Sequence, residues 1–150
     1  MNETKAAPTH LWVVGILALL FTLFGAYDYT MSQMGNREYI AAAVAPMGVD
    51  VDTAVAYFSG FPLWADFVWA LGVWGAVAGS ILLLARSRFA VPAYVLSLVG
   101  LVMSNVYSLT NPMEGMAESS ATYIAVAVVA SVMVALLVYA HRMRQRGVLR

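Results

Sequence analysis

The sequence contains no cysteine and few charges. Its 150 residues include 8 Lys and Arg and 8 Asp and Glu, so the formal net charge is zero. The lack of cysteine excludes disulfides, thiolate catalysis and cysteine metal sites. Because no basic patch lies outside the loops and the tail, the sequence also argues against nucleic-acid binding. Charged residues make up 11% and hydrophobic residues 62% of the chain, whereas an average soluble domain has about 25% and about 45–50%.

Motifs that carry common enzyme chemistry are missing as well. The chain has no phosphate-binding glycine loop, no nucleophile elbow and no zinc-ligand spacing. We therefore predict no enzyme activity, no catalytic residue, no cofactor and no metal. Two M-x-x-M pairs, Met31/Met34 and Met113/Met116, carry thioethers of the kind that suits Cu(I). No His or Cys lies near them, and Met commonly fills packing gaps, so packing is the preferred interpretation.

Long apolar runs dominate the sequence instead. Between Leu63 and Ala85 only Asp66 and Ser80 are polar, which matches the ~20 apolar residues needed to cross a bilayer. Four such runs predict membrane spans at about 10–31, 62–85, 90–109 and 120–140 in a single domain, 1–150. We expect the first span to be retained, because GAYDYTM follows it rather than a small-residue cleavage site.

A more polar stretch, about 32–61, separates the first two spans. Asn36 is placed to cap a short helix through Ala45, and Asp52 to cap a second helix that ends at Ser59. These helices are expected to lie on the membrane surface or to cap the bundle. The predicted fold class is an all-α membrane protein, an antiparallel four-transmembrane-helix bundle with short extracytoplasmic helices between spans 1 and 2.

The basic residues predict the orientation in the membrane. All but one fall on a single side of the four-span arrangement: Lys5, Arg86, Arg88, Arg142, Arg144, Arg146 and Arg150. Only Arg37 falls on the other side. Since Lys and Arg mark the cytoplasmic side, both termini and the tail 141–150 are predicted to be cytoplasmic and the loop 32–61 periplasmic. The tail is expected to bind the anionic inner leaflet, with protein docking as the alternative.

Small residues predict two helix-packing seams. They are Gly72, Gly75 and Gly79 in the second span and Ala127, Ser131 and Ala135 in the fourth. Small side chains let helix backbones approach closely, which drives helix association in lipid. One seam is expected to serve the bundle and the other a partner helix.

The main candidate site is a cluster of polar and aromatic side chains near the outer ends of the spans. Its members are Asp28, Asp66, Asn105, Tyr29, Tyr107 and Trp69. An acid within a span is costly and is a functional hypothesis by default. In an antiparallel bundle these residues would line a shallow, outward-open cavity, suited to a cation, a proton or a polyol. The alternative is an interfacial belt, because Tyr and Trp gather at the interfaces of many membrane proteins.

Several pieces of the chain resemble a known group of proteins. HLWVVGILALLF, GAYDYTMSQ, WALGVWGAVAGSILLLARSR and the ending RMRQRGVLR are similar to small, largely uncharacterised bacterial four-span membrane proteins, some of them labelled sugar transporters. The resemblance covers most of the chain except 37–60. It implies a four-span bundle in a bacterial inner membrane, and it supplies no active-site motif to carry over.

Two functions stay open on the sequence. The first is binding or transport of a small solute or ion through the outward-facing cluster. The second is a non-catalytic accessory or assembly subunit of a larger membrane complex, which the two small-residue seams favour. The expected partners are the lipid bilayer, further copies of the chain or a membrane complex, and a small solute or ion. No inverted repeat or Gly/Pro-broken helix pair is visible, so a conducting path would need an oligomer.

Overall fold

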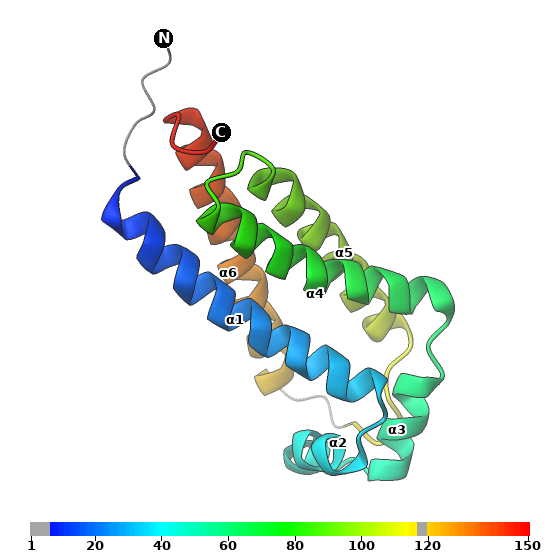
Figure 1. The fold of residues 1–150 in the computed structure, drawn as a ribbon. Helices are drawn as coiled ribbons and strands as arrows, with labels where there is room; N and C mark the ends of the chain where they lie inside the picture. The colour runs from blue at the N-terminus through cyan, green and yellow to red at the C-terminus, as the bar shows by residue number, and fades with distance from the viewer. Residues whose placement is uncertain (1–6, 117–119) are drawn as a thin grey trace.

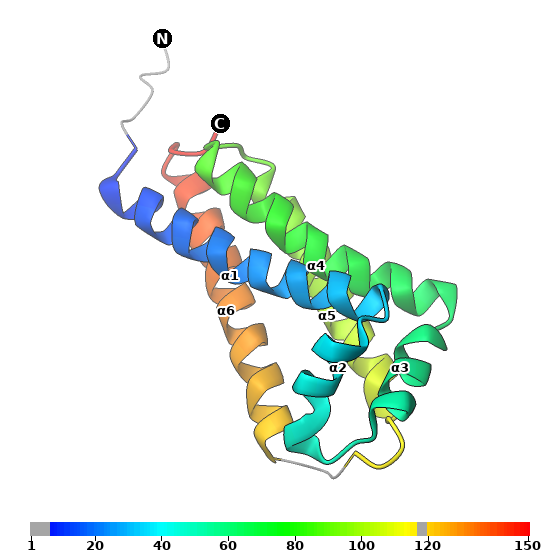
Figure 2. The ribbon, with the colours of Figure 1, turned by 60° about the horizontal axis from the view of Figure 1, so that its bottom comes forward.

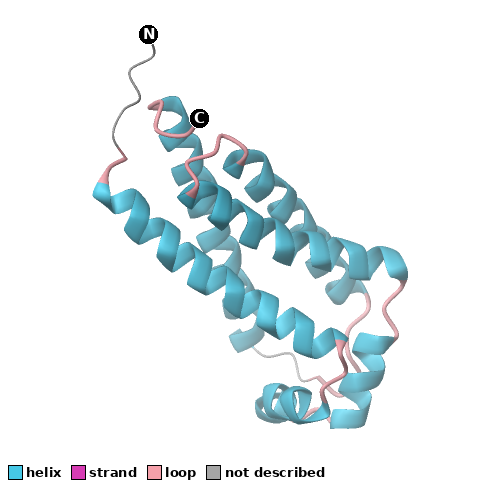
Figure 3. Cartoon of the chain, in the orientation of Figure 1, coloured by secondary structure: helices cyan, strands magenta, loops and turns pink. Residues whose placement is uncertain are grey.

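A computed structural model describes residues 7–116 and 120–150, and these form helices joined by turns and loops, with no strand among them (Figures 1 and 3). Four of the helices are long and apolar enough to cross a membrane. They are α1 (Thr9–Gln33), α4 (Leu63–Leu84), α5 (Ala90–Thr110) and α6 (Ser120–Gln145). The prediction of an all-helical protein is thus confirmed for the described residues. Lys5 lies outside them, as do residues 117–119, the end of the polar turn that the sequence NPMEGMAES predicts between the third and fourth spans.

The four long helices alternate in direction, so Thr9 at the start of α1 and the C-terminus lie at the same end of the bundle (Figures 1 and 2). Helix α4 packs against both α1 and α5, and α5 also contacts α6. Near the chain ends α6 approaches α1, where the His10 Nδ1 atom lies 2.6 Å from the Tyr139 hydroxyl. Towards the opposite end α6 diverges from α1 (Figure 2).

Close packing of α4 on α5 depends on glycine. A Cβ added at Gly100 would lie 2.4 Å from the Gly72 nitrogen, and one at Gly75 would lie 3.2 Å from the Ser97 Cα. One added at Gly79 would lie 2.8 Å from the Tyr94 ring. The glycines therefore set how near the two helices lie.

Hydrogen bonds between helices satisfy the buried hydroxyls. The Ser97 hydroxyl donates to the Gly72 carbonyl across the α4–α5 contact. The Thr22 hydroxyl on α1 lies 3.3 Å from the Ser80 hydroxyl on α4, and Ser80 lies 3.1 Å from the Tyr94 hydroxyl on α5. Every buried side-chain nitrogen or oxygen of the described residues has a partner, as burial of polar groups requires.

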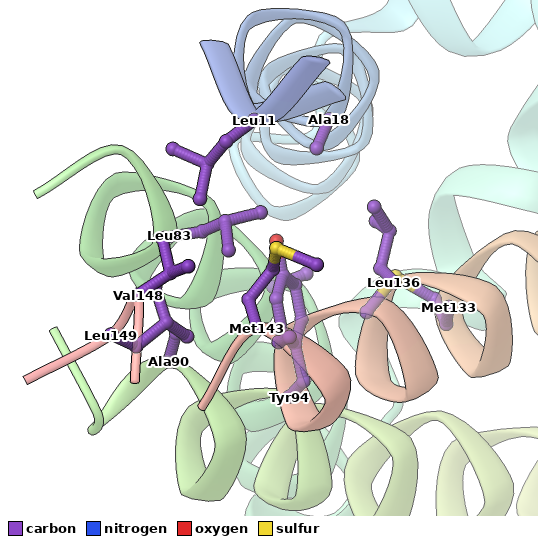
Figure 4. Close-up of a cluster of buried hydrophobic side chains, with 12 residues drawn as sticks. Leu11, Ala18, Leu83, Ala90, Tyr94, Met133, Leu136, Met143, Val148 and Leu149 are labelled. Atoms are coloured by element: carbon purple, nitrogen blue, oxygen red, sulfur yellow. The ribbon is translucent and has the colours of Figure 1, made fainter. Parts of the chain in front are cut away.

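The main hydrophobic cluster lies toward the end that carries the chain termini (Figure 4). Helix α6 contributes Met133, Leu136, Ala140 and Met143 to it. These residues, rather than the predicted small-residue seam, form the inner face of α6.

The C-terminal segment differs from the expected tail. Helix α6 continues to Gln145, and Gly147 with a φ of 72° then reverses the chain. Val148 and Leu149 are buried in the main cluster as a result (Figure 4). The Arg150 N–H donates to the Arg86 carbonyl over 2.7 Å. The last three residues are therefore a packed part of the fold, and only the exposed arginines before them fit a free basic tail.

Two short helices and a 3₁₀ turn connect α1 to α4: α2 (Arg37–Val44), η1 (Ala45–Met47) and α3 (Val51–Ser59). Asn36 caps α2 as predicted, because its side chain accepts the Tyr39 N–H over 3.0 Å. The predicted cap of α3 is wrong. Asp50 caps this helix by accepting the N–H groups of Asp52 and Thr53 over 3.0 and 3.2 Å. Asp52 lies in the first turn and binds Arg37 instead.

These short helices share a second hydrophobic cluster. It contains Ile40, Val44, Val49 and Ala54, together with Met113 from the loop after α5. Arg37–Met47 and Val51–Ser59 together are long and apolar enough for one more membrane span, but the chain bends by 113° between them. They form a cap at the end of the bundle away from the termini (Figure 1).

Candidate functional site

A cavity of about 460 Å³ lies among α1, α4, α5 and α6, near the α3 cap. Phe21 and Phe24 on α1 border it on one side, and Val129 and Met133 on α6 border it on another. It thus occupies the part of the bundle where α6 diverges from α1 (Figure 2). Its volume falls within the about 300–1,000 Å³ of typical small-molecule pockets.

One side of the cavity is an aromatic wall made of Tyr57, Phe58, Phe61 and Trp69. Phe58 stacks on Trp69 with ring centroids 5.8 Å apart, and Phe61 lies 5.7 Å from the same indole. Tyr57 meets Phe61 edge to face at 5.1 Å. Pairs at these spacings stabilise one another, so the wall is a connected surface built from α3, the α3–α4 link and α4.

The polar lining comes from α1 and α5, apart from the phenol of Tyr57. It comprises Thr22, Asp28, Ser97, Ser104, Asn105 and Ser108. Among the described residues that line the cavity, Asp28 is the only one with a charged side chain.

Most of these polar groups direct their protons away from the cavity. The hydroxyls of Thr22 and Ser104 donate to the carbonyls of Leu19 and Leu101, and Ser97 donates to Gly72. The Asn105 amide nitrogen donates to the Leu101 carbonyl over 2.8 Å. What these side chains offer to a ligand is therefore mainly oxygen lone pairs.

Asp28 is held by a residue of the cap. The Tyr39 hydroxyl on α2 donates to Asp28 Oδ1 over 2.7 Å. Burial, and then the hydrogen bond to Asp28, raises the pKa of Tyr39 to about 12. Tyr39 therefore stays a donor at neutral pH. The second oxygen, Oδ2, makes no hydrogen bond with the described residues, so it is the atom left for a ligand.

The structure divides the predicted cluster into three groups. Asp28, Asn105 and Trp69 line the cavity. Tyr29 and Tyr107 do not line it but support the wall, because Tyr29 packs on Trp69 at 4.9 Å and Tyr107 on Phe61 at 5.0 Å.

Asp66 stands apart from the cavity. Its Oδ1 accepts a hydrogen bond from Gln33 Nε2 over 2.9 Å, at the α1–α4 contact. We expected Asp28 and Asp66 to share one cavity, but in the structure only Asp28 lines it. The crossing of α1 over α4 turns Asp28 towards the cavity and gives Asp66 a partner on α1 instead.

The two small-residue seams differ in whether they contact another helix of the chain. Gly72, Gly75 and Gly79 lie in the α4–α5 contact. Ala127, Ser131 and Ala135 are exposed on α6. Ser131 and Ala135 border a shallow groove that continues to Arg142 along the same helix. The seam on α4 is thus used inside the chain, and the seam on α6 faces outwards.

Sequence reasoning missed Tyr39 and most of the aromatic wall. The run AYFSGFP holds Tyr57, Phe58 and Phe61 within five positions, and this aromatic density was the available signal. Its role depends on α3 folding back over the bundle, which no local pattern shows.

Metal chemistry finds no support at the described residues. No group of three or more His, Cys, Asp or Glu side chains there could hold a metal ion. Of the M-x-x-M pairs, Met113 is buried in the second hydrophobic cluster and Met116 packs against it. Packing therefore accounts for this pair.

Comparisons with protein-family models, with curated proteins and with solved structures found no match. The resemblance to small bacterial four-span proteins therefore stays an expectation from the sequence, and the site has to be interpreted from its own geometry.

Proposed function

We propose that this chain is a multi-pass membrane protein whose cavity binds a small solute or ion, either to carry it or to sense it. The cavity is the observation on which the proposal depends. It combines an aromatic wall, one carboxylate and several oxygen acceptors in a volume of about 460 Å³. Pockets of this kind, mostly apolar with a few converging polar groups, are typical of small-molecule sites.

The exposed surface supports the membrane assignment. Large apolar side chains cover the outer face of α1, where Ile16, Leu17 and Leu20 are 53%, 61% and 61% exposed. A soluble monomer rarely exposes a continuous row of large apolar side chains along a helix. We place Arg86, Arg88 and the α6 arginines on the cytoplasmic side by the positive-inside rule. The cap and the cavity then face the periplasm of a bacterial inner membrane.

The natural lack of cysteine allows a direct test of the cavity. Ser104 lines it, so a Ser104→Cys variant places a single thiol there. In lipid nanodiscs we expect this thiol to react with neutral methyl methanethiosulfonate. Gly25 also lines the cavity, and a Cβ there meets no atom within 4 Å. A Gly25→Leu change should therefore start from open space and extend into the cavity, and should slow the labelling because it excludes part of the reagent.

The matched control is Ala78→Leu, which places the same leucine side chain on the exposed face of α4. It should leave the labelling rate unchanged. An unreactive thiol at position 104, or equal rates with Gly25→Leu and Ala78→Leu, would contradict a solute-accessible cavity.

A second candidate is an accessory subunit of a larger membrane complex or a homo-oligomer. The outward-facing seam on α6, bordered by a shallow groove, favours it. Small residues on an exposed helix face suit contact with another transmembrane helix. In this case Ala135→Leu should remove a partner or a second copy in gentle extracts, whereas Ala125→Leu, exposed elsewhere on α6, should not. Unchanged association in both variants counts against the candidate.

A further inference from the structure

The polar lining of the cavity offers more hydrogen-bond acceptors than donors. A bound anion needs hydrogen-bond donors or cations. Here the hydroxyls of Thr22, Ser97 and Ser104 and the amide of Asn105 already donate to main-chain carbonyls. The three hydroxyls can then only accept, and the Asn105 amide keeps one N–H beside its acceptor oxygen. The single charge of the lining, on Asp28, is negative.

The apolar lining favours an organic ligand. The rings of Phe58, Phe61 and Trp69 line the cavity and contact one another. Aromatic faces attract ammonium groups that have lost their water, and Trp does so best. A bare metal ion would instead need several oxygen or nitrogen ligands at once, and the described part of the chain has no cluster of three such acidic or His residues.

We propose that the cavity binds a substituted organic ammonium ion, with its charged nitrogen near Asp28 and its apolar groups against the aromatic wall. This inference rests on the proposed function and names the ligand class of the same site. Asp28 supplies the counter-charge through Oδ2, while Tyr39 is a positioning residue that holds Oδ1. The Asn105 side-chain oxygen, which makes no hydrogen bond with the described residues, is a second acceptor.

The test uses the full chain in nanodiscs with the single Ser104→Cys thiol. Labelling rates are compared for the cationic 2-(trimethylammonium)ethyl and the anionic 2-sulfonatoethyl methanethiosulfonates. A Ser59→Cys variant, exposed on α3, gives the reference ratio. We expect the cavity thiol to prefer the cationic reagent at least about tenfold over this reference, because nearby opposite charges interact strongly in a partly dry site. Phenyltrimethylammonium should slow the labelling by neutral methyl methanethiosulfonate.

Two variants show whether the cation preference comes from Asp28 or from the overall negative charge of this end of the protein. Asp28→Asn should bring the cation preference down to the reference ratio and abolish protection. Asp66→Asn makes the same charge change away from the cavity, beside Gln33, and should leave both unchanged. Tyr39→Phe should keep the preference for cations but weaken protection, since it frees Oδ1 without removing the charge.

The possible results test the ammonium ligand and the solute-accessible cavity separately. A thiol that reacts with the neutral reagent but shows no cation preference, or no protection, overturns the ammonium ligand and leaves the solute cavity standing. A preference that survives Asp28→Asn overturns it as well. A thiol that reacts with none of the reagents contradicts the accessible cavity itself. The comparison of reagents on Ser104→Cys alone decides the matter if Asp28→Asn fails to fold.

Discussion

Substitution of Gly100 by alanine should weaken the protein through one steric contact. The new Cβ would lie 2.4 Å from the Gly72 nitrogen, 2.5 Å from the Val68 oxygen and 2.7 Å from the Gly72 Cα. All three atoms belong to the backbone of α4, so no flexible side chain can move aside. Ordinary contact begins at 3.4 Å, so the helices must separate by about 1 Å. The separation also strains the hydrogen bond from Ser97 to Gly72.

Gly25→Ala provides the matched control for this change. Its Cβ would meet no atom within 4 Å, and both substitutions replace a glycine inside a long helix. The gain in helix propensity, about 1 kcal/mol, is therefore common to the two variants. Their difference isolates the steric cost, which for overpacking against rigid atoms is about 2–3 kcal/mol.

Equilibrium unfolding in mixed micelles, followed by circular dichroism, measures this difference. We expect Gly25→Ala to be at least as stable as the wild type and Gly100→Ala to be less stable than Gly25→Ala by about 2–3 kcal/mol. Equal free energies of unfolding for the two variants would refute the packing of α4 on α5 described above.

Three further predictions concern the two ends of the bundle. Leu149→Ala should lower the free energy of unfolding by about 2 kcal/mol because Leu149 is buried; Arg150→Ala, an exposed neighbour, should not, and an equal effect of both would contradict the docked C-terminus. Asp50→Ala removes the cap of α3 and should lower the stability of its first turn by about 1 kcal/mol. Amide hydrogen exchange in that turn should therefore be faster than in the wild type, and faster than in Asp52→Ala. The pKa of Tyr39 is raised from 10.0 to about 12, so this tyrosine contributes stability that is present below pH 10 and is lost as the pH rises towards 12. Parallel pH–stability curves for wild type and Tyr39→Phe would contradict this.

Much of the fold could be predicted from the sequence because the bilayer imposes long apolar helices. The spacing of Gly72, Gly75 and Gly79 on one face of α4 indicated a close helix contact, although it did not identify α5 as the neighbour. On α6 the same rule was ambiguous. Ala127, Ser131 and Ala135 have the spacing of a packing seam but are exposed. Small residues show where another helix can pack closely, but they do not identify that helix.

The choice between neighbouring residues was the harder part of the candidate site. Asp50 and Asp52 are both good helix caps, and only the backbone conformation shows that Asp50 takes the role. Asp28 lies near the end of α1 and Asp66 near the start of α4, yet Asp28 lines the cavity whereas Asp66 has Gln33 as its partner. The turn at Gly147, followed by two apolar residues, was a signal for the packed C-terminus that the basic composition of the tail obscured.

Native mass spectrometry of the protein, extracted gently from its own membrane, shows whether the cavity holds a ligand. We expect a small-molecule adduct on the wild type that persists in Ala78→Leu and is lost in Gly25→Leu, because only the second change fills the cavity lined by Gly25. A wild-type chain that carries no adduct and instead leaves the membrane in a fixed ratio with another protein would contradict a solute-binding role and favour the accessory-subunit alternative.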